Sequence, residues 1–141
     1  MLEPGRITAS FKWSEFACHD AEKTPVPEAF RGNAYALAVE LERVRNACGG
    51  KKLIVTRAYS TPAHNATIPG AAKNSYHLRC LAADILSPEG MTVDGLVRNI
   101  RMVASLYTAC KIRYVKIYDD GHVHLDIRDG TTLVVEDART T

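Results

Sequence analysis

The sequence predicts an α+β fold in which a largely antiparallel sheet packs against two main helices. Residues 28–48 and 93–110 repeat apolar side chains at the three- and four-residue spacing of amphipathic helices. Short segments rich in β-branched residues lie around them, and the sequence DDG at 119–121 separates two of these segments as a hairpin turn would. The chain has 141 residues, 46% of them hydrophobic. We therefore expect one domain over residues 1–141 with an ordinary core.

The N-terminal half predicts a short helix, a long helix and a strand. Ser14 is a suitable N-cap for one helical turn through residues 15–18. The long helix over 28–48 is closed by two glycines at 49–50, which favour the end of a helix. Residues 52–56, KLIVT, are rich in β-branched side chains and predict a strand.

The remaining elements are a long loop and several strands. Residues 57–76 contain two prolines, a glycine and two asparagines, and a loop of this length in a compact domain is usually functional. Residues 81–86 predict a buried strand, and 112–118 with 122–128 predict a hairpin. Residues 131–136, TTLVVE, add an edge strand.

The bulk composition excludes several classes of function. The net charge is +2, and acidic and basic residues are interspersed, so neither nucleic acid nor a membrane surface is indicated as a partner. The four cysteines form no CxxC pair, and we interpret them as small buried side chains. The N-terminal residues do not resemble a signal peptide, and no apolar run is long enough to span a membrane. We therefore expect a protein made in the cytoplasm.

An aspartate inside the apolar run LAADIL points to a functional site. Burying an unpaired carboxylate is costly, so Asp84 needs a partner if this strand lies in the interior. The later stretch HVHLD offers candidates. Side chains alternate along a strand, so His122, His124 and Asp126 face one side while the intervening apolar residues face the other.

A metal ion held by two imidazoles and one carboxylate would account for Asp84. His77 precedes Asp84 by seven residues, and His124 would complete the set if the two strands are neighbours. Such a site keeps one coordination position open for water, as catalytic zinc sites do.

These residues also carry a resemblance to a known family. SYHLRCLAADI followed by HVHLD resembles the S-x-H-x-x-G-x-A-x-D and H-x-H signatures of the M15 peptidases, which are zinc D-Ala-D-Ala carboxypeptidases and murein endopeptidases. FKWSEFACHD, VTRAYSTPAHN and HLDIR extend the likeness to residues 10–130. The ordered set is similar to the compact branch common among phage lysins, and it implies an M15/hedgehog-like zinc peptidase fold.

The resemblance implies roles for individual residues. Zinc would be bound by His77, Asp84 and His124. His122 would be the catalytic base, since an imidazole has a pKa suited to proton transfer near neutral pH, and Asp120 is the second choice.

Supporting roles are implied for neighbours of the ligands. Asp126 would orient His124 or an adjoining loop, and Ser75 and Tyr76 would brace His77.

The sequence departs from the family at two positions. Where the family has an arginine that binds substrate, this chain has Ser60, and an arginine occurs three residues earlier at Arg57; we consider both as substrate-binding residues. Where the first motif has glycine, this chain has Cys80. Glycine commonly marks a turn with positive φ, and a thiol near zinc could become an unwanted ligand.

Three functions follow from these observations. The leading one is a zinc peptidase that cleaves peptidoglycan stem peptides, reaching the wall after holin-type release or within a phage particle. The first alternative is an M15-fold phage structural or wall-binding protein that keeps zinc with little catalysis and contacts virion proteins. The second is an Fe(II) oxygenase, because two histidines and one carboxylate also bind iron.

Overall fold

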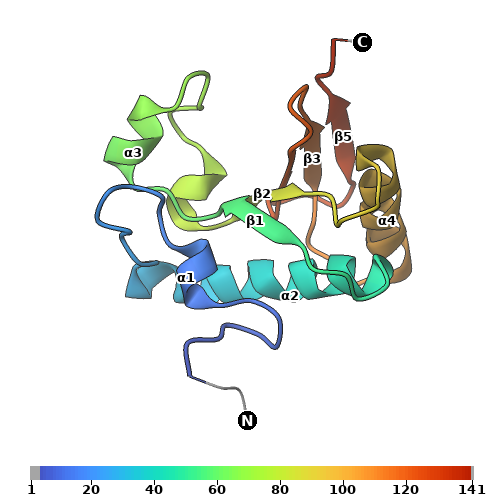
Figure 1. Ribbon diagram of the computed structural model, residues 1–141, viewed down its shortest axis with the longest axis horizontal. Coiled ribbons are helices and arrows are strands. Elements are labelled where there is room, and N and C mark those ends of the chain that lie inside the picture. The colour runs from blue at the N-terminus through green and yellow to red at the C-terminus, as the bar shows by residue number, and fades with distance from the viewer. Residues whose placement is uncertain (1–3, 141) are drawn as a thin grey trace.

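A computed structural model describes residues 4–140 and contains a five-stranded sheet with helices on both sides (Figure 1). The prediction of an α+β fold is confirmed. In chain order the elements are α1 (Trp13–Phe16), η1 (Glu28–Phe30), α2 (Arg31–Ala47), β1 (Ile54–Arg57), α3 (Pro62–Thr67), η2 (Tyr76–Arg79), β2 (Ala82–Leu86), α4 (Val93–Leu106), β3 (Tyr114–Ile117), β4 (Val123–Asp126) and β5 (Val134–Asp137).

The sheet is antiparallel except at one edge. The strand order is β1-β2-β4-β3-β5, and only the β3–β5 pair is parallel. β3 and β4 form the expected hairpin, whose turn contains Gly121 with a φ of 90°. This φ is strained for residues with a side chain, so glycine suits the position. The order places β2 beside β4, which is the arrangement that a shared metal site requires.

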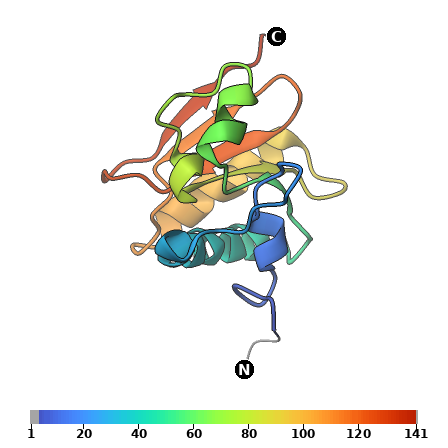
Figure 2. The same ribbon diagram turned by 90° about the vertical axis from the view of Figure 1, so that its left-hand side faces the viewer.

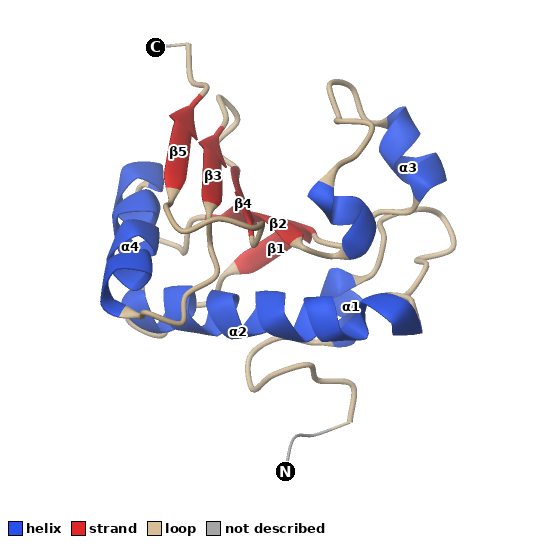
Figure 3. Cartoon of the chain, turned by 180° about the vertical axis from the view of Figure 1, so that it is seen from behind, coloured by secondary structure: helices blue, strands red, loops and turns tan. Residues whose placement is uncertain are grey.

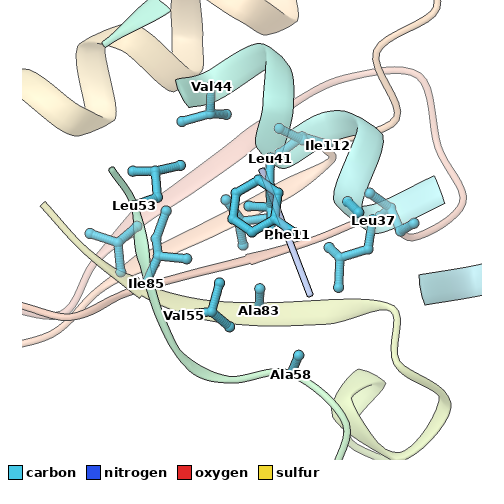
Figure 4. Packing of buried hydrophobic residues seen from close by; sticks show 14 of the residues in the cluster. Phe11, Leu37, Leu41, Val44, Leu53, Val55, Ala58, Ala83, Ile85 and Ile112 are labelled. Atoms are coloured by element: carbon cyan, nitrogen blue, oxygen red, sulfur yellow. The ribbon is translucent and has the colours of Figure 1, made fainter. Parts of the chain in front are cut away.

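The core lies between the sheet and α2 and α4. Alternation sends Val55, Ile85 and Leu125 toward the helices, and these side chains are almost fully buried. Leu37 and Leu41 of α2 are completely buried as well, and Figure 4 shows them beside the apolar side chains of β1 and β2. This packing leaves the opposite face of the sheet free for polar side chains.

The segment that contains α3 and η2 lies on that opposite face. Figure 2, viewed from the end of the sheet, shows α2 on one side and α3 on the other. Residues 57–76, predicted to be one long loop, therefore contain the helix α3. Thr61 Oγ1 accepts a hydrogen bond from the His64 N–H at 3.1 Å and caps α3, and Pro62 occupies its first turn. The helix was missed because PAHNAT has no apolar periodicity.

The element ends also differ from the sequence prediction. The first short helix begins at Trp13, so Ser14 lies inside it and Lys12 holds the cap position. Residues 28–30 form a separate 3₁₀ turn before α2, and α4 ends at Leu106. Among the described residues, no helix combines the length and apolar character that a membrane crossing needs.

Candidate metal centre

Three potential metal ligands converge on the polar face of the sheet. Asp84 and His124 are direct partners in the β2–β4 ladder, and His77 lies on η2 immediately before β2. Asp84 Oδ1 is 3.0 Å from His124 Nδ1 and 3.3 Å from His77 Nε2. The donor atoms of the three residues all lie within 4.8 Å of one another, so the predicted neighbours do meet.

His77 is held so that one ring nitrogen is available. Its Nδ1 donates a hydrogen bond to the Ala58 carbonyl at 2.7 Å, which leaves the lone pair on Nε2. This Nε2 is buried and has no hydrogen-bond partner among residues 4–140. Burial lowers the pKa of His77, so the ring is neutral at physiological pH, the form that binds a metal ion.

Asp84 has the partners that its buried position demands. The residue is 9% exposed. Burial alone would raise its pKa, but the contacts of Oδ1 with the rings of His124 and His77 outweigh burial and hold the pKa well below its usual range. The carboxylate in LAADIL is therefore ionised and paired.

His124 lies between two carboxylates. Its Nδ1 faces Asp84, and its Nε2 is 2.8 Å from Asp126 Oδ2. Burial would lower the pKa of His124, but the bonds to Asp126 and Asp84 raise it overall. Because Asp126 is completely buried and its pKa is lowered, mainly by Arg128 acting against burial, this carboxylate needs a donor, which His124 Nε2–H supplies.

This donor set suits a zinc ion. It provides two imidazole nitrogens and one carboxylate oxygen, and the unpartnered buried Nε2 of His77 is explained if a cation binds there. Within residues 4–140, no second group of three such side chains brings its donor atoms as close.

The centre opens into a cleft of about 710 Å³. Figure 3 shows the backbone around it, with the segment that contains α3 and the strands β3 and β5 on opposite sides of β2. The cleft is lined by Arg57, Ile68, Pro69, Gly70, Ala71, Ala72, Asn74, Ser75, Tyr76, His77, Asp84, Tyr114, Lys116, Tyr118, His122, His124, Asp126 and Arg128. The centre is thus accessible to an extended ligand.

His122 lies in the same cleft and is oriented by two contacts. Its Nδ1 is 2.5 Å from Asp120 Oδ1, and its ring stacks on Tyr118 with centroids 4.2 Å apart. The backbone N–H and the ring of His122 both lower the pKa of Asp120, so the carboxylate accepts the Nδ1 proton. Nε2 of His122 is then the nitrogen available to accept another proton.

A bulge in β1 brings Arg57 to the centre. Val55 pairs with Ile85, yet Arg57 rather than Thr56 pairs with Asp84. The extra residue shifts the alternation by one, so Arg57 faces the cleft beside Asp84. Its Nη2 donates to Asn65 Oδ1 at 2.7 Å.

Ser60 does not reach the cleft, which corrects its assignment as a substrate contact. It is completely buried, and its backbone N–H donates to the His77 carbonyl at 3.0 Å. Periodicity from Arg57 fails here because the chain turns into α3 directly after β1. Ser60 therefore supports the segment that carries His77.

Ser75 and Cys80 shape the turn around His77. Ser75 Oγ accepts a hydrogen bond from the His77 N–H at 3.2 Å and caps η2. Cys80 has a φ of 56°, the left-handed conformation that glycine favours, and is completely buried. Burial raises the pKa of its thiol to about 12. Cys80 thus keeps the glycine-like turn and lies in the apolar core rather than at the cleft.

Sequence reasoning missed two residues of this face, Tyr114 and Arg128, while Tyr76 lies beside His77 as expected. A signal for Arg128 exists in the sequence, since the alternation of residues 122, 124 and 126 continues to residue 128. Tyr114 carries no such signal, because its position depends on how η2 and β3 meet in space.

Two imidazoles and one carboxylate that meet in an open cleft form the ligand set of a catalytic metal site, such as that of a metallopeptidase. Comparison with family models identifies the family: the model described as Peptidase M15 matches residues 9–126. This span covers most of the chain, so the protein belongs to the Peptidase M15 family, and the resemblance seen in the sequence is confirmed. No curated protein gives a significant match.

Proposed function

We propose that this protein is a zinc-dependent peptidase that cleaves peptide bonds of peptidoglycan, as a D-Ala-D-Ala carboxypeptidase or a murein endopeptidase. The observation that carries the proposal is the convergence of His77 Nε2, Asp84 Oδ1 and His124 Nδ1 at the base of an open cleft. Membership of the M15 family supports a peptidase, and the resemblance to the compact phage branch supports a wall substrate and a phage origin.

His77, Asp84 and His124 would hold the zinc ion. Zinc bound there supplies a Lewis acid that polarises a scissile carbonyl and lowers the pKa of a bound water. The protein contributes the fixed ligand orientation: the Ala58 carbonyl holds His77, and Asp126 holds His124.

His122 would transfer the proton. Its Nδ1 is occupied by Asp120, so Nε2 takes a proton from the attacking water and delivers it to the leaving amine. This arrangement gives both candidate catalytic residues a place: His122 exchanges the proton, and Asp120 fixes its tautomer. Stacking on Tyr118 limits rotation of the ring.

Arg57 would bind a negatively charged part of the substrate. The bulge carries its guanidinium to the cleft, and Nε has no hydrogen-bond partner in the part of the chain that the structure describes. A carboxylate of a stem peptide would satisfy this group. In this proposal Arg57 replaces the arginine that the family carries at the position of Ser60.

The alternative is an M15-fold phage structural or wall-binding protein that retains zinc with little catalysis. It was motivated by the departures at Ser60 and Cys80. Both now have a structural account, since Arg57 reaches the cleft and Cys80 adopts the left-handed turn. The peptidase is therefore favoured over the wall-binding protein, and family membership favours it over the oxygenase.

The test measures amino groups released from purified peptidoglycan, with zinc content determined on the same sample. We expect one equivalent of zinc and release that a chelator stops and added zinc restores. His122→Gln is the matched control, because it leaves the three ligands in place. A full equivalent of zinc without release from several wall types would overturn the peptidase and favour the wall-binding protein. Iron in place of zinc would favour the oxygenase.

A further inference from the structure

Arg128 lines the cleft and bonds to Asp126, the carboxylate that contacts His124. Its Nε and Nη2 bond to Asp126 Oδ1 and Oδ2 at 2.7 and 2.6 Å, a bidentate pair. Its guanidinium carbon also lies 4.6 Å from the centroid of the Tyr76 ring and 4.2 Å from that of Tyr114. The arginine is thus fixed by a carboxylate at its end and by two aromatic rings.

We propose that Arg128 is a positioning residue that sets His124 for metal binding through Asp126 and ties the two halves of the centre together. The inference rests on the proposed zinc site and deepens it. It concerns how the ligands are held, and it does not assign Arg128 to the reaction itself.

The first part of the proposal follows from the hydrogen-bond geometry. Asp126 is completely buried and uses both oxygens on Arg128. The bidentate pair fixes the plane of the carboxylate, so Oδ2 accepts the His124 Nε2–H at 2.8 Å. In this ring orientation Nδ1 of His124 faces Asp84, on the side where the metal ion would bind.

The second part follows from where the two tyrosines lie. Tyr76 is next to His77 on η2, and Tyr114 pairs with Asp126 across β3 and β4. The guanidinium between the rings therefore connects the segment that carries His77 to the sheet that carries His124. Cation–π contacts of the guanidinium with both rings stabilise this connection between η2 and the sheet.

An ion pair on the protein surface would not hold Asp126 and His124 in place in this way. Exposed pairs contribute little because water screens both charges. Here the arginine side chain is 33% exposed, but its partner carboxylate is 0% exposed. Removing Arg128 would leave Asp126 buried and short of donors, free to rotate away from His124.

The test measures zinc affinity by competition with a chromophoric chelator. We expect Arg128→Gln to weaken zinc binding about tenfold to a hundredfold, as loss of groups that orient metal ligands typically does. Arg128→Lys should recover only part of this loss, because an ammonium cannot form the planar bidentate pair. Arg79→Gln is the matched control: Arg79 also stacks on Tyr76, at 5.4 Å, and forms no bond to Asp126. It should keep the affinity of the unmodified protein.

A double-mutant cycle isolates the route through Asp126. If Arg128 acts through this carboxylate, Arg128→Gln should have a much smaller effect in an Asp126→Asn background than alone. Circular dichroism of each variant confirms folding before affinity is compared. Additive effects, or an affinity for Arg128→Gln equal to that of Arg79→Gln, would overturn the proposal.

A metal-free measurement separates this inference from the proposed function. In a crystal structure of the metal-free Arg128→Gln variant, the Asp126 carboxylate should rotate, so that Oδ2 no longer lies within hydrogen-bond distance of His124 Nε2. If the unmodified protein binds no zinc, the proposed function fails, and this structure still tests whether Arg128 holds Asp126 in place. An Asp126–His124 contact that is unchanged in the variant would reject the role of Arg128 even if the peptidase is active.

Discussion

The metal centre joins two regions that are ordered in different ways. Asp84 and His124 lie on central strands and face each other because β2 and β4 pair in a fixed register. His77 lies on a four-residue 3₁₀ turn and is held by a few separate hydrogen bonds, among them those from its N–H to Ser75 Oγ, from its ring to the Ala58 carbonyl and from the Ser60 N–H to its carbonyl. A ladder distributes its stability over many bonds, whereas a turn depends on a few. The turn is therefore where a small change should alter the metal site without unfolding the protein.

The largest effect is expected from removing Asp84, the proposed ligand in the sheet whose carboxylate lies close to both His77 and His124. Asp84→Ala should abolish zinc binding, because Asp84 is the carboxylate between His77 and His124. Zinc content per protein after gel filtration measures this. Asp137→Ala, which removes an exposed aspartate of the same sheet, should keep zinc. A full equivalent of zinc in Asp84→Ala would refute the assigned site.

The next effect concerns His122, which directly precedes β4 and is not a proposed zinc ligand. His122→Gln should reduce peptidoglycan cleavage about a hundredfold to ten-thousandfold, the usual contribution of a general base, while zinc content stays complete. The rate of amino-group release at saturating substrate measures it. Activity equal to that of the unmodified protein would remove His122 from the mechanism and leave Asp120 to be tested.

Arg57 lies where the two regions meet, at the end of β1 and bonded to Asn65 of α3. Arg57→Gln should slow cleavage about a hundredfold to a thousandfold, by analogy with the loss of one charge-stabilising donor. Zinc content should not change, because Arg57 is not a ligand. Arg57→Lys tests whether charge alone suffices. If Arg57→Gln cleaves normally, the bulge would have no role in substrate binding.

The smallest expected effect comes from removing a helix cap, and it tests whether the turn that carries His77 depends on few contacts. Ser75→Ala and Thr92→Ala each remove one N-cap, at η2 and α4 respectively, and each should cost about 1 kcal/mol of folding free energy. Only Ser75→Ala should also weaken zinc binding, because only that cap holds His77. Urea unfolding and chelator competition on both variants measure the two quantities. Equal zinc affinities would mean that the turn is held by the fold as a whole.

The sheet region could be predicted largely from the sequence. Alternation in HVHLD assigned His124 and Asp126 to one face, and the buried carboxylate of LAADIL required a partner. Both arguments depend on short-range periodicity and on the cost of burying charge. The turn region escaped these arguments because α3 and η2 are short and polar, and their position depends on caps and contacts with distant strands.

Two details show where periodicity fails. Residues three apart on an extended chain face opposite sides, so periodicity separates Arg57 from Ser60 without showing which one reaches the site. The bulge in β1 turns Arg57 toward it. At position 80 a glycine was expected for a left-handed turn, and Cys80 adopts that conformation with its side chain in the core. Backbone irregularities of this kind are set by packing and are invisible to a pattern of residue types.

The sequence by itself determined the α+β class and the family and predicted His77, Asp84 and His124 as candidate metal ligands, because residue types and their spacing can be read along the chain. Only the tertiary structure decided that Arg57 faces the cleft, that Ser60 does not, and that Arg128 stands between Tyr76 and Tyr114 behind Asp126. These placements join η2, β1, β3 and β4, segments far apart in the chain. Their physical cause is the pairing and packing of those segments, which no local pattern encodes.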